Sequence, residues 1–216
     1  MLTLICGDKG SGKTLVCVRN ICMNKKKLAF TNFNLIGLKH YIRLKENDIT
    51  IKDKEGNWAV NWDLWEKVHE KFKKFDIYID EITQIEMLNS REHRGKRNIA
   101  GTKFVAQIRK VLGDSRDSNL YLICQNIEQL DVAWRRLADT IIYCYKKTKK
   151  DKKGIEWVTI YLLTFKSTGL THCSTLFDAF RKCCKSWNRP RYRFKANPYY
   201  KYYESRKFVK KEEGLL

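Results

Sequence analysis

Gly7-Asp8-Lys9-Gly10-Ser11-Gly12-Lys13-Thr14 is the stretch that decides the fold of this chain. It fits the pattern G-x-x-x-x-G-K-[ST] and lies between an apolar strand candidate, residues 2–6, and an apolar-periodic helix candidate, residues 14–22. The glycines let backbone N–H groups turn toward phosphate oxygens, and the helix start adds its positive dipole end. Lys13 would reach the β- and γ-phosphates, and the Thr14 hydroxyl would ligate Mg²⁺. A glycine-rich turn without a ligand is the alternative, but motif and flanking elements together predict a nucleoside triphosphate site.

Length and charge narrow the class of protein and its partners. The 216 residues carry 44 Lys and Arg against 24 Asp and Glu, a formal net charge of +20. A field of this sign attracts polyanions, so we expect nucleic acid as the first partner and an anionic membrane surface as the second. We expect a P-loop ATPase domain over residues 1–165 and a basic aromatic extension over residues 166–216. Arg and Lys alternate with aromatic rings in that extension, which predicts DNA binding, packing on the domain, or both.

The eight cysteines indicate a reducing compartment, because several lie in apolar strand or helix patterns where a thiol acts as a small hydrophobic group. The cluster of His172, Cys173, Cys183 and Cys184 lacks the ligand spacing of structural zinc sites, so metal binding there is not favoured. No charged-then-apolar leader precedes the first strand, and the longest mostly apolar stretch, residues 157–165, is too short to span a bilayer. The sequence predicts a soluble, cytoplasmic protein, in the host cytoplasm if it is viral.

Strand and helix patterns alternate along the rest of the chain. Strands are expected at residues 28–31, 75–81, 119–124, 140–145 and 157–163, and helices at 62–74, 103–112 and 127–138. We expect an irregular insertion or small hairpin at residues 35–61. We also expect a polar basic loop at residues 87–101 and a charged turn at residues 146–153. This alternation predicts an α/β fold, a mostly parallel sheet flanked by helices, with the last two strands antiparallel.

Two of the expected strands end in polar groups suited to phosphate chemistry. Asp80 and Glu81 close the strand at residues 75–81, and Gln125 follows the strand at residues 119–124. Such strand ends lie at the crevice where open α/β sheets bind ligands. After a P-loop, the acidic pair is typical of a Walker B motif, in which Asp80 holds Mg²⁺ and Glu81 polarises the attacking water. Gln125 either orients that water and senses the γ-phosphate or is an ordinary strand-terminating amide.

The order of these motifs resembles the FtsK/HerA superfamily of P-loop ATPases. The resemblance is carried by residues 7–14, which form the Walker A motif, by residues 77–81, by residues 122–125 and by the arginine-bearing helix that follows. Thr31-Asn32 and residues 130–135 are similar to the Zot-type ATPases of filamentous phages. The resemblance covers roughly residues 1–145 and implies an additional-strand, catalytic-glutamate ATPase with a RecA-like sheet.

Carried across residue by residue, the resemblance implies ATP and Mg²⁺ as cofactors. Lys13 and Thr14 would act on phosphate and metal, Asp80 on the metal, Glu81 as catalytic base and Gln125 as sensor. Family members act as homo-oligomeric rings in which an arginine reaches a neighbour's nucleotide. The candidates for that arginine are Arg109, Arg116, Arg135 and Arg136, and we carry Arg135 forward as the catalytic prediction.

The leading interpretation is an ATP-driven motor that translocates or packages double-stranded DNA, in the manner of a viral genome-packaging ATPase, with a capsid or membrane-associated assembly partner. The alternative is a Zot-like phage assembly or export ATPase that acts at a membrane through partners. Zot-type proteins usually carry a transmembrane helix after the ATPase domain, whereas this chain continues into a basic aromatic segment, which favours the DNA motor. A small-molecule kinase is less favoured because Glu81 and Gln125 suit activation of water. A nucleotide-dependent binding module with negligible turnover is also less favoured, because Lys13, Asp80 and Glu81 are all present, and kinetics can exclude it.

Overall fold

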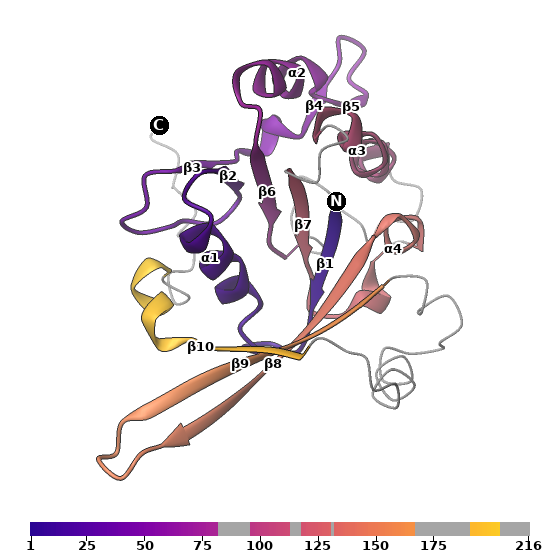
Figure 1. The fold of residues 1–216 in the computed structure, drawn as a ribbon. Helices are drawn as coiled ribbons and strands as arrows, with labels where there is room; N and C mark the ends of the chain where they lie inside the picture. The colour runs from indigo at the N-terminus through magenta and orange to yellow at the C-terminus, as the bar shows by residue number, and fades with distance from the viewer. Residues whose placement is uncertain (82–95, 113–117, 131, 167–190, 204–216) are drawn as a thin grey trace, which may run out of the picture.

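One long sheet organises the computed structural model, which describes residues 1–81, 96–112, 118–130, 132–166 and 191–203 (Figure 1). Its eight strands run in the order β10-β9-β8-β1-β7-β6-β2-β3. Their bounds are β1 (Leu2–Cys6), β2 (Leu28–Thr31), β3 (Tyr41–Arg43), β6 (Phe75–Ile79), β7 (Asn119–Ile123), β8 (Thr140–Lys150), β9 (Glu156–Lys166) and β10 (Arg191–Lys195). The strands from β8 to β3 are parallel, and β8, β9 and β10 pair antiparallel. The predicted mostly parallel sheet is therefore confirmed, and β10 is an addition to it.

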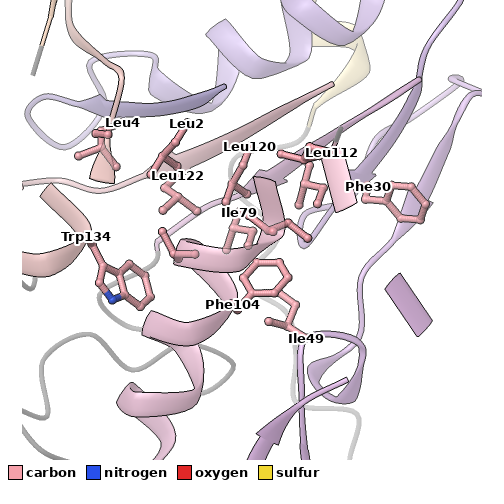
Figure 2. Packing of buried hydrophobic residues seen from close by; sticks show 14 of the residues in the cluster. Leu2, Leu4, Phe30, Ile49, Ile79, Phe104, Leu112, Leu120, Leu122 and Trp134 are labelled. Atoms are coloured by element: carbon pink, nitrogen blue, oxygen red, sulfur yellow. The ribbon is translucent and has the colours of Figure 1, made fainter. Parts of the chain in front are cut away.

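Helices cover both faces of this sheet. On one face lies α1 (Lys13–Met23), and on the other lie α2 (Trp62–Lys71), α3 (Lys96–Leu112) and α4 (Val132–Leu137) (Figure 1). Alternate residues of β1 serve the two layers, since Leu2 and Leu4 pack toward α3 and Ile5 packs toward α1. Figure 2 shows Phe104 of α3 and Trp134 of α4 beside the central strands. Burial on both faces explains why the central strands are nearly continuous apolar runs.

The insertion between β2 and β6 forms the small hairpin that its sequence predicts. Strands β4 (Thr50–Lys52) and β5 (Trp58–Val60) pair antiparallel, after a short 3-10 helix, η1 (Glu46–Asp48). The following helix α2 starts at a capped end, because the backbone N–H of Leu64 donates to Asn61 Oδ1 at 3.3 Å. This hairpin and α2 lie at the end of the molecule opposite the β8–β9 turn (Figure 1).

Two predictions on the α3–α4 side of the sheet are wrong. Residues 96–101, expected in a loop, already belong to α3, whose buried face begins at Ala100; the rest of the expected loop, up to residue 95, lies outside the described residues. The single helix expected at residues 127–138 is broken into η3 (Ile127–Gln129) and α4. Leu130 has extended backbone between them and buries its side chain, so core packing interrupts the helix.

The charged run after Tyr145 is also not the turn that we expected. Residues 146–150 continue β8, paired in register with β9, and the turn is confined to residues 151–155. Asp151 closes that turn, because its Oδ1 accepts hydrogen bonds from the backbone N–H groups of Lys153 and Ile155, both at 2.9 Å. A partner strand therefore imposes strand structure on a lysine-rich sequence that has little strand propensity of its own.

Residues 191–203 pack on the domain, which is one of the two roles left open for the extension. After β10, the chain forms η5 (Asn197–Tyr202), which contacts α1 and reaches the loop after β2. The backbone N–H of Ala196 donates to Val158 O at 2.8 Å, and that of Ile36 donates to Tyr202 O at 2.9 Å. The domain boundary at residues 165 and 166 stays a prediction.

Cysteines in the described part of the chain are free thiols. Burial raises the pKa of both Cys124 and Cys144 to about 12, so these thiols stay protonated and unreactive. His172, Cys173, Cys183 and Cys184, whose spacing disfavours a zinc site, lie outside the described residues. Across the ranges that the structure covers, we find no helix long and apolar enough to cross a membrane.

Candidate active site

The P-loop leads from the end of β1 into α1 and needs glycine at defined points. Gly7, Gly10 and Gly12 have φ angles of 145°, 74° and 95°, a region that side-chain-bearing residues rarely adopt. A Cβ on Gly7 would lie 2.3 Å from the carbonyl oxygen of Cys144, and one on Gly12 would lie 2.4 Å from Cδ1 of Ile160. The loop is therefore seated directly on β8 and β9.

Lys13 lies folded back across this loop. Its side chain is buried, and Nζ donates hydrogen bonds to the carbonyl oxygens of Gly7 at 2.7 Å and Asp8 at 3.0 Å. The Ser11 hydroxyl is buried and has no hydrogen-bond partner among the described residues. A buried ammonium, an unpartnered hydroxyl and the N-terminus of an eleven-residue helix without acidic residues in its first turn all favour an anion. The residues present thus fit the phosphates of a nucleotide.

Thr14 and Asp80, the two predicted metal ligands, are in direct contact. The Thr14 hydroxyl donates to Asp80 Oδ2 at 2.6 Å, and the backbone N–H of Glu81 donates to Asp80 Oδ1 at 2.8 Å. Burial raises the pKa of Asp80, whereas these two hydrogen bonds lower it. Hydroxyl and carboxylate oxygens are hard ligands of the kind that Mg²⁺ prefers, and Mg²⁺ keeps several waters and needs few protein ligands. In the described ranges no group of three or more His, Cys, Asp or Glu is placed to hold a metal ion, so this pair is the candidate.

Asn32 fixes the strand end that carries this carboxylate. Its Nδ2 donates to the carbonyl oxygen of Asp80 at 2.9 Å, and the backbone N–H of Asp80 donates to Asn32 Oδ1 at 2.7 Å. Glu81 follows with a φ of 53°, the single non-glycine residue with positive φ in the described chain. This left-handed turn ends the path of β6 and leaves the Glu81 side chain exposed. Sequence analysis named Asn32 only as part of a family resemblance and gave it no role in the site. An amide directly after a buried strand could have indicated such a role.

Gln125 lies beside the P-loop, as its position after β7 predicts. Strand β7 is inserted between β1 and β6, so the strand ends that carry the P-loop, Gln125 and Asp80 are neighbours in that order. The backbone N–H of Gly7 donates to the carbonyl oxygen of Gln125 at 3.3 Å. The amide side chain is half-buried, and its role as a sensor stays a prediction.

The structure gives less support to the arginine candidates than to the other predicted site residues. Arg135 lies on α4 and is half-buried, and its Nε is buried without a hydrogen-bond partner among the described residues. Arg136 on the same helix is exposed. Arg116 and the side chain of Arg109 lie outside the described part. A role for Arg135 at a neighbouring subunit's nucleotide stays a prediction.

Tyr203 is a site residue that sequence reasoning missed. Its ring packs edge-on against Phe33 with centroids 6.0 Å apart, and its hydroxyl lies near the Thr14 side chain. Burial raises the pKa of Tyr203, and the nearby carboxylates of Asp80 and Glu81 raise it further. The residue comes from the far end of the chain, so no local pattern could place it here.

The strand order, with β7 inserted between β1 and β6, and the geometry of the P-loop together define a P-loop NTPase fold of the additional-strand type. The sequence itself matches no protein family and no curated protein. In structure, the chain is similar to the N-terminal domain of zonular occludens toxin from Neisseria meningitidis, with a TM-score of 0.52, 18% identity, and coverage of 94% of this chain and 98% of that one. At this identity the similarity establishes the fold.

A second similar structure is the genome packaging NTPase B204 from Sulfolobus turreted icosahedral virus 2, in complex with ATP-gammaS. Its TM-score is 0.47 at 12% identity, over 77% of this chain and 92% of that one. This superposition is too loose to support an argument of its own.

Proposed function

We propose that this protein is an ATP-hydrolysing P-loop motor that translocates or packages DNA. The observation that supports it most is the Thr14–Asp80 hydrogen bond of 2.6 Å beside a fully formed P-loop, with Glu81 next in the chain. A phosphate cradle, a metal pair and a free carboxylate then lie at the ends of adjoining strands. This combination suits the activation of an attacking water by Glu81.

The residues of the site divide the work of hydrolysis. Backbone N–H groups of the P-loop and the Lys13 ammonium bind the β- and γ-phosphates, and Lys13 exchanges the Gly7 and Asp8 carbonyl oxygens for phosphate oxygens as ATP enters. Thr14 and Asp80 would hold Mg²⁺, and the ion would supply positive charge against the phosphate oxygens. Both Asp80 oxygens already accept hydrogen bonds, so the exposed Glu81 is the carboxylate that can take a proton from water.

The choice of DNA as the partner rests on charge. A formal net charge of +20 favours a polyanion, and the resemblance to ring-forming DNA motors adds a homo-oligomeric assembly in which Arg135 reaches the next subunit's nucleotide. Capsid or membrane-associated proteins are the assembly partners in this proposal. The free, buried thiols agree with a reducing cytoplasm.

Steady-state ATP hydrolysis with Mg²⁺, measured with and without double-stranded DNA at two salt concentrations, tests this function. Glu81→Gln is expected to bind ATP normally and to lower turnover by about 10²–10⁴-fold, the typical contribution of a general base. Glu66→Gln, which changes an exposed glutamate on α2, is the matched control. Unchanged turnover in Glu81→Gln removes Glu81 from the mechanism, and hydrolysis indifferent to DNA removes the motor role.

A second candidate function is a Zot-like phage assembly or export ATPase that acts at a membrane. One observation favours it: Asn32, part of the Thr31-Asn32 pair that carries the Zot-type resemblance, is the residue that holds Asp80. Flotation with anionic vesicles separates the two functions, because a DNA motor has no need to bind lipid. Flotation together with hydrolysis that ignores DNA would favour the second candidate.

A further inference from the structure

The antiparallel strands β8, β9 and β10 gather basic residues on one side. Cross-strand partners in a sheet point to the same side. The register pairs Tyr145 with Tyr161, Lys147 with Thr159 and Lys149 with Trp157, and it places Arg193 and Lys195 opposite Tyr161 and Thr159. We call this set the basic face: Tyr145, Lys147, Lys149, Trp157, Thr159, Tyr161, Arg193 and Lys195.

The charge of the basic face is of one sign. Lys147, Lys149, Arg193 and Lys195 are all exposed. Among the described residues of the three strands on this side none is acidic, since Glu156 pairs with Lys150 on the other side. One carboxylate borders the face at its outer end, where Asp151 of the turn accepts a hydrogen bond from Trp157 Nε1 at 3.2 Å. Four cations on β8 and β10, the two strands that flank β9, form a surface suited to a row of phosphates.

On the opposite side of the same strands, part of β9 and β10 is buried against α1. Ile160, Leu162 and Phe194 belong to the hydrophobic cluster that surrounds this helix. Arg19 of α1 donates a hydrogen bond to the Tyr192 hydroxyl, and its guanidinium lies 4.7 Å from the Tyr192 ring centroid. Strand β10 thus separates its basic and aromatic residues: Tyr192 and Phe194 lie on the α1 side, where Phe194 is buried and Tyr192 stays partly exposed, and Arg193 and Lys195 lie on the basic face.

The rings that do lie on the basic face support its cations. Tyr145 and Tyr161 stack with centroids 4.9 Å apart and planes 9° from parallel. Lys147 Nζ lies 5.7 Å from the Tyr161 centroid, and Lys195 Nζ lies 4.7 Å from that of Trp157. Cations held in place by rings suit fixed phosphates.

The shape of this region also fits a duplex. β8 and β9 extend from the sheet as a two-stranded arm (Figure 1). Further exposed lysines, Lys150, Lys152 and Lys153, surround its turn. The major groove of B-DNA, about 12 Å wide, admits a two-stranded β-ribbon. We propose that the basic face and this arm bind the phosphate backbone of double-stranded DNA, a proposal that rests on the proposed function and assigns its DNA-binding surface.

This location places bound DNA on strands that also support the P-loop. A Cβ on Gly12 would meet Ile160 of β9, and one on Gly10 would lie 3.7 Å from Lys146 Nζ of β8. Lys146 and Ile160 are on the inner side of the strands whose outer side forms the basic face. If DNA binding moves the β8–β9 arm, only one layer of side chains, which includes Lys146 and Ile160, separates that movement from the P-loop.

The test compares two variants of the full chain that lose the same charge. In the face variant Lys147, Lys149, Arg193 and Lys195 become Gln. In the control variant four exposed lysines elsewhere, Lys25, Lys26, Lys54 and Lys73, become Gln. Fluorescence anisotropy with a labelled duplex, over a series of salt concentrations, gives the affinity and its salt slope. If the face variant does not fold, the pair Lys147→Gln/Lys149→Gln is compared with Lys25→Gln/Lys26→Gln.

We expect the face variant to lower the salt slope by about 3 to 4, since each lost phosphate contact removes about 0.9, and to bind the duplex at least about tenfold more weakly at low salt. The control variant keeps a slope close to that of the wild type. An unchanged slope in the face variant, or an equal loss in the control, overturns the proposal. So does wild-type protein that binds anionic vesicles through these residues and leaves the duplex free.

The same samples separate this proposal from the proposed function. The face variant is expected to keep the basal ATP hydrolysis measured without DNA, because its changes lie outside the nucleotide site. Duplex binding that depends on the basic face in a protein without hydrolysis leaves the surface standing and overturns the motor. DNA-stimulated hydrolysis that persists in the face variant leaves the motor standing and overturns the surface.

Discussion

Asn32→Ala tests whether the amide at the end of β2 holds the metal carboxylate. The change removes two hydrogen bonds, from Asn32 Nδ2 to Asp80 O at 2.9 Å and from Asp80 N to Asn32 Oδ1 at 2.7 Å. Each contributes about 1 kcal/mol net, and the site is half-open to water, so we expect a loss of about 2 kcal/mol in unfolding free energy. Residues that orient a metal ligand typically change metal affinity by about 10–100-fold, so the Mg²⁺ concentration for half-maximal hydrolysis is expected to rise by that factor.

Two measurements check this prediction. Urea unfolding gives the change in stability, and ATP hydrolysis titrated with Mg²⁺ gives the change in metal dependence. Asn34→Ala, which removes an exposed amide from the same loop, is the control for both. A Mg²⁺ dependence within twofold of the wild type would refute the positioning role, even if stability falls, because a purely structural amide changes stability alone.

Three further predictions concern the same site. Asp80→Asn should raise the unfolding free energy at neutral pH, because burial raises the pKa of Asp80 above its usual 3.8 and disfavours its charge. The gain should shrink as pH falls through the raised pKa, as urea unfolding at two pH values will show, and Mg²⁺-dependent hydrolysis should be lost. Gly7→Ala should cost about 3 kcal/mol or more, since its Cβ would strike a backbone oxygen of β8, whereas Gly10→Ala should cost about 1–2 kcal/mol for its left-handed backbone alone; thermal unfolding ranks the two. Tyr203→Ala removes the edge-on ring contact with Phe33 and should cost about 1 kcal/mol or more by the same assay.

The parts of the site that sequence predicts are those whose chemistry is local. The P-loop needs eight consecutive residues, and the acidic pair needs a buried strand before it, so both are visible in short windows. The adjacency of Gln125 to Gly7 also follows from sequence, because parallel strands present their carboxyl ends at one edge. Fold class is predictable for the same reason, since the strand and helix periods alternate along the chain.

The remaining features depend on partners far away in the sequence. The lysine-rich residues 146–150 form strand only because β9 pairs with them, and Tyr203 reaches Thr14 only because β10 carries the chain back along α1. Asp76 is a similar case, because in the sequence it is a single charged residue within the apolar strand β6. In the fold it is 2% exposed, pairs with Lys27 at 3.3 Å, and accepts hydrogen bonds from the backbone and side chain of Asn119, both at 2.9 Å. No window of sequence contains these contacts.

The central place of β1 in the sheet has a consequence for the synthesis of the protein. This first strand is fully buried, yet its two neighbours, β7 and β8, are made much later. At about 5–20 residues per second, a ribosome needs on the order of 6 to 23 s to travel from Cys6 to Asn119. During that interval an apolar strand remains unpaired, and the P-loop lacks the supports that Cys144 and Ile160 provide. Nucleotide binding is thus among the last properties that the nascent chain acquires, and ATP bound to a newly made chain reports that the strands on both sides of β1 are in place.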